Sequence, residues 1–383
     1  MGDFVIYLDN AATTRVLPAA AEAAVQMMRE DYFNPSAQYE AAAGVRKTLE
    51  TMRSTLAKIM GAKKAEQIVF TSGGTEGANL AIRSAIYVNR HAKGKHIVTT
   101  EIEHSAVMQP MKMLEQAGYS VTYLKPDKWG EICSEQVREA VTAETILVSM
   151  MAVNNELGTV LPLAAVKAAI EEKGSTALFH TDAVQGFLKV PLDVNKLGID
   201  YLSVSGHKIG GPKGVGALYC REPGKLIAPE ILGGGQESGR RAGTENMPSI
   251  AAFVTAAKVR HGRLEQDWAY MAALRDEIFR RVEEMEGVEL LAKGAAPHIV
   301  ALSLRGYPGE NTLRFLDTEF HVCVSTGSAC AKGKGSRIYQ ALGRAPEVPM
   351  GALRVSLSPD STREDVNWLF QGLAAAKERL VHR

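Results

Sequence analysis

Seven short runs of apolar and β-branched residues alternate with longer, helix-like stretches between residues 66 and 221. The runs are 67–71, 96–100, 121–124, 145–151, 177–181, 201–205 and 215–220. Strands that are apolar throughout have to be covered on both faces, which is typical of a parallel sheet between two layers of helices. The pattern therefore predicts an α/β fold, with a mainly parallel seven-stranded sheet in a large domain.

Polar segments follow five of these runs, at the point where each run ends. They are 72–75, 101–104, 154–156, 182–185 and 205–208. The carboxyl ends of parallel strands meet at one edge of a sheet, where folds of this class bind their ligands. We therefore expect one ligand site, built from these five segments.

The pattern changes after Pro248. A long helical stretch, 249–286, precedes apolar runs at 299–304, 322–325 and 353–357 and a helix from Thr362 onward. Helices mixed with few strands predict a smaller α+β domain. We expect the large domain to span residues 15–250, and the small domain to combine residues 1–14 with residues 251–383.

The charge and the cysteines exclude several classes of protein. The 383 residues carry 44 Lys+Arg against 43 Asp+Glu without a basic stripe, so direct nucleic acid binding is not expected. No apolar run reaches the roughly 18 residues of a membrane span. The four cysteines show neither a CxxC pair nor zinc-finger spacing, and the N-terminus lacks a leader pattern. These features predict a reduced, cytoplasmic protein without a resident metal.

The segment 72–76 could hold a phosphate. It lies between a predicted strand and a predicted helix, so that amides at the helix start, the small Gly74 and the hydroxyl of Thr75 would surround an anion. The motif is neither a P-loop nor a dinucleotide-binding fingerprint. Taken alone, it is more often a tight turn with a Ser/Thr cap.

Two ionisable residues follow later strands. Lys208 would be a nucleophilic amine if apolar walls lower its pKa, although such a lysine is more often solvated. Asp182 ends an apolar run, where a buried carboxylate needs a cationic partner. Its alternative role is to cap a helix that begins near Ala183. A protonated pyridine nitrogen would satisfy Asp182 and would also explain a phosphate cradle and a reactive lysine at the same edge.

Together these features resemble the pyridoxal-phosphate enzymes of fold type I, and the sequence is most similar to the cysteine desulfurases of the class V aminotransferase family. The segments that carry the resemblance are 7–14, 72–76, 103–105, 153–158, 180–185, 205–208, 233–237, 243–246 and 325–330. They follow one another in the family's order from residue 7 to about residue 357. The resemblance implies an enzyme that converts L-cysteine to L-alanine.

The resemblance assigns residues to the cofactor, pyridoxal 5'-phosphate. Lys208 would bind it covalently and Asp182 would pair with its pyridine nitrogen. His104 would stack on the ring and take part in proton transfer, although a histidine at a turn is as often structural. Contacts to the phosphate, the phenolic oxygen and the substrate side would come from Gly74, Thr75, Ser205, His207, Gln185 and Asn155. Thr244 would reach the phosphate of a second subunit, which implies a homodimer with shared sites.

The resemblance also assigns the substrate contacts. Arg354 would bind the substrate carboxylate bidentately, whereas alone it could equally form a surface salt bridge. Cys330 would attack the substrate sulfur as a thiolate and pass a persulfide to an acceptor or scaffold protein for iron–sulfur clusters, thiolated RNA or sulfur cofactors. It could transiently ligate such a cluster. Its small neighbours predict an exposed, mobile segment, and Cys323 is expected to be a buried structural thiol.

Two alternatives remain. The first is another enzyme of the same fold, a selenocysteine lyase or a class V transaminase, which needs Lys208 and Asp182 but no thiol at position 330. The second is a non-catalytic sulfur-relay partner, which would show no absorption band from a lysine-bound cofactor. The residue after Cys330 is Ala331, where many cysteine desulfurases carry a hydroxyl residue, so the identity of the acceptor stays open.

Overall fold

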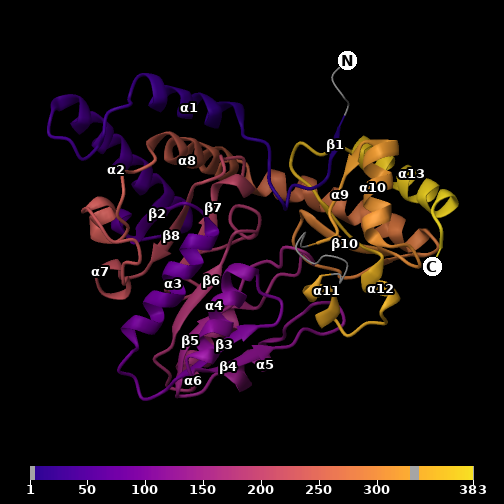
Figure 1. Cartoon of the computed structure of the whole chain (residues 1–383), viewed down its shortest axis with the longest axis horizontal. Coiled ribbons are helices and arrows are strands. Elements are labelled where there is room, and N and C mark those ends of the chain that lie inside the picture. The colour runs from indigo at the N-terminus through magenta and orange to yellow at the C-terminus, as the bar shows by residue number, and fades with distance from the viewer. Residues whose placement is uncertain (1–4, 328–335, 383) are drawn as a thin grey trace.

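A computed structural model of the chain describes residues 5–327 and 336–382. It shows a large part built around a seven-stranded sheet and a smaller part that contains the C-terminal third of the chain (Figure 1). Within the described residues, no helix is both long and apolar enough to cross a lipid bilayer.

The large sheet runs in the order β2-β8-β7-β6-β5-β3-β4. Its strands are β2 (Ile68–Thr71), β3 (His96–Thr100), β4 (Ser120–Leu124), β5 (Thr145–Ser149), β6 (Leu178–Asp182), β7 (Tyr201–Ser205) and β8 (Gly216–Cys220). Strand β8 is antiparallel to both of its neighbours, and the remaining pairs are parallel. The predicted mainly parallel seven-stranded sheet is confirmed.

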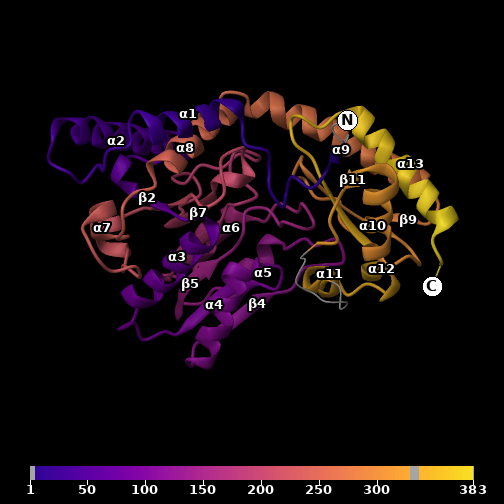
Figure 2. The ribbon, with the colours of Figure 1, turned by 45° about the horizontal axis from the view of Figure 1, so that its top comes forward.

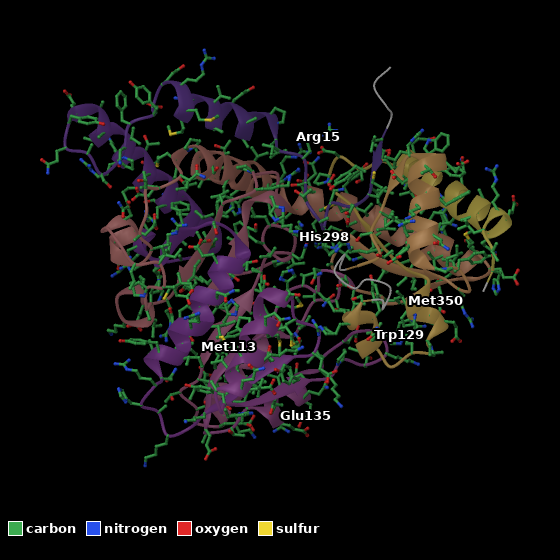
Figure 3. The ribbon with its side chains drawn as sticks, in the orientation of Figure 1. Arg15, Met113, Trp129, Glu135, His298 and Met350 are labelled. Carbon is green, nitrogen blue, oxygen red and sulfur yellow. The ribbon has the colours of Figure 1, made fainter. Side chains whose placement is uncertain are left out.

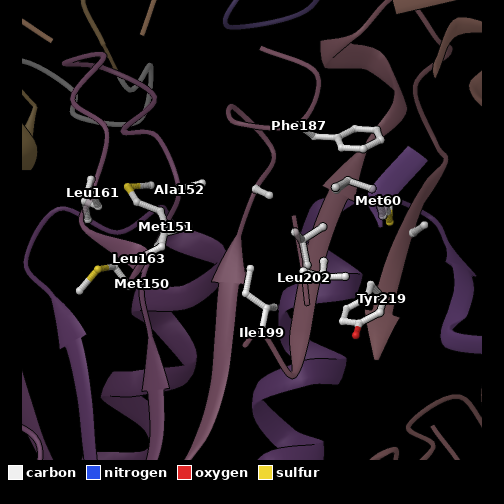
Figure 4. Packing of buried hydrophobic residues seen from close by; sticks show 14 of the residues in the cluster. Met60, Met150, Met151, Ala152, Leu161, Leu163, Phe187, Ile199, Leu202 and Tyr219 are labelled. Carbon is white, nitrogen blue, oxygen red and sulfur yellow. The ribbon is translucent and has the colours of Figure 1, made fainter. Parts of the chain in front are cut away.

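Helices cover both faces of this sheet. Helices α3 (Gly74–Val88) and α4 (Ser105–Gln116) pack on one face, and α2 (Glu40–Met60), α5 (Ser134–Ala140), α6 (Leu163–Glu172) and α8 (Met247–His261) pack on the other. Strand side chains alternate between the two cores, so Leu218 contacts the first and Tyr219 the second. Figure 4 shows Tyr219 in the second core with Leu202 and Phe187. Helix α1 (Pro18–Arg29) lies on α8, and the short α7 (Pro223–Leu226) follows β8.

The smaller part combines helices with a three-stranded antiparallel sheet, β12-β10-β9. Figure 2 shows this part from a second direction. Its strands are β9 (Val288–Leu290), β10 (Ile299–Leu304) and β12 (Ala352–Ser356), beside the parallel pair β1 (Ile6–Tyr7) and β11 (Val322–Cys323). Its helices are α9 (Leu264–Glu284), α10 (Gly309–Phe320), α11 (Arg337–Ala341), α12 (Glu347–Met350) and α13 (Arg363–Arg379). The helix expected from Thr362 is confirmed, because the hydroxyl of Thr362 caps α13 by accepting the amide of Asp365 at 3.1 Å.

The predicted helical stretch 249–286 is divided. Helix α8 ends at His261 and α9 begins at Leu264, with Gly262 between them. The expected domain boundary at residue 250 lies inside α8, whose Phe253 and Val254 pack into the core of the large part.

The N-terminal segment, residues 8–14, connects the smaller part to the large part. The amide of Leu8 donates to the carbonyl oxygen of Cys323 at 3.0 Å, and the amide of Thr14 donates to that of His207 at 2.9 Å. The hydroxyl of Thr14 also donates to the His207 carbonyl at 2.9 Å. This segment therefore crosses directly beside the carboxyl ends of the large sheet's strands.

Candidate active site

A cavity of about 630 Å³ lies where the polar segments after β2, β3, β5, β6 and β7 converge. Of the residues predicted for the site, ten line it: Gly74, Thr75, His104, Asn155, Asp182, Gln185, Ser205, His207, Lys208 and Arg354. The N-terminal segment contributes Asp9, Ala11 and Ala12 to the same wall, and the smaller part closes the far side. The convergence of five strand ends on one site therefore holds in the structure.

Lys208 lies at the end of the single turn Gly206–Lys208 that follows β7. Its Nζ donates to the carbonyl oxygens of Ala11 at 2.6 Å and Ala12 at 2.7 Å. Burial, and next the nearby charge of Arg354, lower the pKa of Lys208 from 10.5 to about 8. Because a neutral amine is accessible near physiological pH, Lys208 can act as a nucleophile or a base.

Asp182 is a buried carboxylate without a cation beside it. It ends β6, and its Oδ1 accepts the amide of Val184 at 3.0 Å. In the part of the chain that the structure describes, no lysine, arginine or histidine nitrogen lies within 4.0 Å of it, and burial raises its pKa. The residues after it form turns rather than a helix, so the alternative helix-capping role is wrong. Asp182 therefore has capacity for a cation from outside the chain.

His104 has both a structural contact and access to the cavity. It precedes α4, and its Nδ1 accepts the amide of Ala106 at 3.1 Å, which caps the helix. The capping bond fixes Nδ1 as the unprotonated nitrogen. Its Nε2 is therefore the nitrogen that carries the proton, and His104 lines the cavity near Asp182.

The start of α3 has the features of an anion site. The first amides of a helix have no partner within the helix, and α3 begins at Gly74. A Cβ at position 74 would collide with the side chain of Val184, so this close approach requires glycine. Glu76 holds the turn by accepting the amide of Ser72 at 2.8 Å and by pairing with Arg241 at 3.0 Å. Thr75, Ser205 and His207 lie on the adjoining wall.

Arg354 on β12 has one free edge. Its Nη2 donates to Asp9 Oδ1 at 2.6 Å and its Nη1 donates to the carbonyl oxygen of Asn155 at 3.0 Å. Its Nε is buried and has no hydrogen-bond partner among the described residues. The Oδ1 of Asn155 is likewise buried and unpaired there. Asp9 and Asn155 therefore hold the guanidinium through its two Nη atoms, and its Nε is left without a partner among the described residues.

The other predicted residues differ in whether they lie at the cavity. His207 Nδ1 lies 3.2 Å from the hydroxyl of Thr13, and burial, with Lys208 next, lowers its pKa to about 4. Thr244 is exposed and does not line the cavity of its own chain. Cys323 is half-buried on the short strand β11 rather than buried, which corrects the expectation. Cys330 lies outside the described residues.

Sequence reasoning missed Glu103, which precedes His104 in the cavity wall. Glu103 is fully buried, and its Oε1 accepts from the hydroxyl of Thr100 and the amide of Met151, both at 2.9 Å. Its Oε2 has no partner within the described part of the chain, and burial raises its pKa to about 8. The signals in the sequence were its place in a polar segment after a strand and in the segment 103–105 that resembles the family, and neither assigned it a role.

We expect Glu103→Gln to remove a pH-dependent loss of stability. The folded chain holds a proton on Glu103 up to about pH 8, whereas the unfolded chain releases it near its ordinary pKa of 4.5. Between these values the folded state binds more protons, so stability falls as pH rises, on the order of 1.4 kcal/mol per unit of pKa shift. Urea unfolding should therefore show the variant more stable than the parent at alkaline pH and nearly equal at about pH 5. Parallel pH curves for both proteins would contradict this assignment.

Known proteins are similar to this chain along nearly its whole length. The sequence pattern of the family described as aminotransferase class-V matches residues 6–369. A cysteine desulfurase IscS of Dictyoglomus turgidum is 38% identical over 380 residues, which cover 98% of this chain and 95% of the relative. A cysteine desulfurase IscS of Methanosarcina thermophila is 38% identical over 379 residues, which cover 98% and 92%.

The fold of this chain is also similar to the folds of solved structures. A structure described as a NifS-like protein superposes with a TM-score of 0.90 at 32% identity, and the match covers 98% of this chain and all 100% of that one. A structure described as SspA in complex with cysteine superposes with a TM-score of 0.80 at 33% identity, and the match covers 93% of this chain and 99% of that one.

Proposed function

Since this chain belongs to the class V aminotransferase family and, within it, is a cysteine desulfurase, we propose that it takes sulfur from L-cysteine in the cavity beside Lys208 and leaves L-alanine. One observation carries the proposal. The same cavity presents a lysine amine of lowered pKa, a buried carboxylate without a cation at Asp182, and an unpaired Nε on Arg354. These three groups suit a covalently bound cofactor, its protonated nitrogen and a substrate carboxylate.

Class V aminotransferases use pyridoxal 5'-phosphate, and the cavity residues fit this cofactor. Asp182 would hold the pyridine nitrogen, because its carboxylate is buried without another cation. The open amides at the start of α3, with Gly74 and Thr75, would hold the phosphate beside Ser205 and His207. When bound, the cofactor supplies an electron sink for the electron pair left when the Cα–H bond breaks.

The side chains of the protein bind the substrate and move its protons. Arg354 would bind the substrate carboxylate through Nε and the second hydrogen of Nη2, while Asp9 accepts from Nη2 and the carbonyl oxygen of Asn155 accepts from Nη1. The amine of Lys208 would take the Cα proton, for which a pKa of about 8 is well matched at neutral pH. The fixed tautomer of His104 would offer Nε2 as a second proton carrier.

Cys330 would be the sulfur acceptor. Gly327 and Ser336, which flank the segment that contains Cys330, both line the cavity. A Cys330 thiolate would attack the sulfur of L-cysteine, so that a sulfur–sulfur bond forms and the Cβ–sulfur bond breaks. The electron pair of the broken bond stays on carbon and is protonated, which gives alanine without a further oxidant or reductant. The persulfide on Cys330 would then pass to a scaffold or carrier protein.

We also propose a homodimer with shared sites. Thr244 is exposed outside the cavity of its own chain, on a glycine-rich segment held in place by two ion pairs. Arg53 pairs with Glu237 at 2.5 Å, and Arg241 pairs with Glu76 at 3.0 Å. An exposed segment that these ion pairs hold in place is suited to reach the phosphate site of a partner subunit. Sedimentation of the cofactor-loaded protein as a monomer would contradict the shared site.

The activity is tested by incubating the purified protein with pyridoxal 5'-phosphate, L-cysteine and a thiol reductant. We expect alanine and sulfide to form in equal amounts, because the reductant releases the persulfide sulfur. No alanine from L-cysteine would overturn the proposal. Turnover of L-selenocysteine without turnover of L-cysteine would favour a selenocysteine lyase instead.

A further inference from the structure

The amide of Gln185 lies on the cavity wall between three partners. Its Nε2 donates to the carbonyl oxygen of Ala11 at 2.8 Å. Its Oε1 accepts from Lys189 Nζ at 3.2 Å and lies 3.3 Å from His298 Nε2. All three side chains are buried, and His298 comes from the smaller part of the chain, immediately before β10. Figure 3 labels His298 at the junction of the two parts.

These partners allow one orientation of the amide. The oxygen and nitrogen of a glutamine amide have nearly the same shape, so its hydrogen bonds decide which atom points where. A carbonyl oxygen only accepts, which fixes Nε2 beside Ala11. Lys189 Nζ donates to Oε1, and it carries N–H donors in either protonation state, so it supports the same orientation. A flipped amide would place its oxygen against the carbonyl oxygen of Ala11 and would lose the hydrogen bond that Lys189 donates.

Burying the amine of Lys189 costs free energy, which indicates that the residue does more than fill space. Its side chain is 8% exposed, and Gln185 Oε1 is its only hydrogen-bond partner within residues 5–327 and 336–382. No carboxylate pairs with it there, and the charges that act on it, Lys208, Arg260 and Arg354, are all positive. Burial, with these charges, lowers its pKa well below the ordinary value, and the amine carries an N–H donor in either protonation state. A position that needed only to be filled would be better served by an apolar side chain.

We infer that Lys189 is a positioning residue for the cofactor site, which holds Oε1 of Gln185 away from the cavity so that Nε2 presents an N–H to it. One hydrogen of Nε2 is taken by Ala11, and the second is left for a ligand in the cavity that Gln185 lines. The inference rests on the proposed function, because the acceptor for this hydrogen would be the phenolic oxygen of pyridoxal 5'-phosphate. If the Gln185 amide were flipped, its oxygen would face the phenolic oxygen of the cofactor and repel it.

The test is a double-mutant cycle on the affinity for pyridoxal 5'-phosphate. The cofactor-loaded full-length protein is dialysed against graded concentrations of pyridoxal 5'-phosphate, and occupancy is read from the visible absorption of the bound form. We expect Lys189→Met to weaken binding about tenfold and to shift the absorption band when Gln185 is present. In a Gln185→Ala background the same change should have an effect of less than about twofold, because Lys189 acts through Gln185.

Two further variants separate positioning from packing. Lys189→Gln keeps an N–H donor, so it should bind the cofactor within about threefold of the parent. Lys196→Met alters an exposed lysine on the following loop and should have no effect beyond about twofold. Thermal unfolding of every variant shows whether it is folded.

The outcomes also distinguish this inference from the proposed function. If the parent protein binds no pyridoxal 5'-phosphate, the proposed function fails and the inference fails with it. If the parent binds the cofactor but Lys189→Met has the same effect with and without Gln185, or no effect at all, only the inference is wrong. An equal loss in Lys189→Gln and Lys189→Met would also overturn it.

Discussion

Lys208→Ala is expected to lower the rate of alanine formation from L-cysteine by more than about 10³-fold, because it removes both the nucleophile that attaches the cofactor and the base that takes the Cα proton. Among the described residues that line the cavity, Lys208 is the only lysine. Its amine is positioned by hydrogen bonds to the carbonyl oxygens of Ala11 and Ala12. A water molecule in its place would be a much weaker base than an amine. The measurement is alanine released with time, together with the visible spectrum of the purified protein.

Matched variants show that the loss belongs to the amine and not to a positive charge. Lys208→Arg keeps the charge but cannot attach the cofactor or accept a proton at neutral pH, so it should lose as much activity as the alanine variant. Lys213→Ala alters an exposed lysine in the loop between Lys208 and β8 and should change the rate by no more than about twofold. A lysine-bound absorption band that persists in Lys208→Ala would contradict the assignment.

The large sheet was predictable because most of its strands are buried on both faces. Each of the seven apolar runs coincides with an observed strand, and the polar segments after five of them converge on the cavity. Burial on both faces leaves a local signal, an uninterrupted apolar run, that does not depend on distant residues. The same signal was misleading at Cys323, which lies on a two-residue strand that is only partly covered.

The contacts between distant segments were not predictable from one sequence. Asp9 holds Arg354, 345 positions away in the chain, and Lys208 rests on carbonyl oxygens of the N-terminal segment. Glu103 and Lys189 acquire their properties from burial, which follows from how layers of the fold close around them. A backbone carbonyl has no sequence signature, and a buried charge resembles a surface charge until its neighbours are known.

The junction between the two helices of the predicted stretch 249–286 was also not predictable from the sequence. Gly262 separates α8 from α9, and the two helices pack into different cores. A single glycine inside a helical pattern is often tolerated. The change of core, which is a tertiary feature, decides that the helix ends here.

Cys330→Ser is expected to lower the formation of alanine from L-cysteine by more than about 10³-fold while leaving the cofactor bound, because a serine hydroxyl is scarcely ionised at neutral pH and is a poor nucleophile toward sulfur. The position itself lies outside the described residues, and the prediction rests on the family assignment and on its flanks, Gly327 and Ser336, which line the cavity. The measurement is alanine and sulfide released with time, with L-cysteine binding followed by the change in visible absorption.

This variant separates the proposed reaction from its nearest alternative more sharply than Lys208→Ala does. A selenocysteine lyase or a transaminase of the same fold also needs the lysine, so loss of activity in Lys208→Ala is common to all of them. Only sulfur abstraction by a protein thiol requires Cys330, and the half-buried Cys323 and the exposed Cys133 serve as matched controls that should tolerate serine within about twofold. Undiminished desulfuration by Cys330→Ser, with the cofactor spectrum intact, would show that sulfur leaves without a persulfide on this residue, and the assignment of its role would then be wrong.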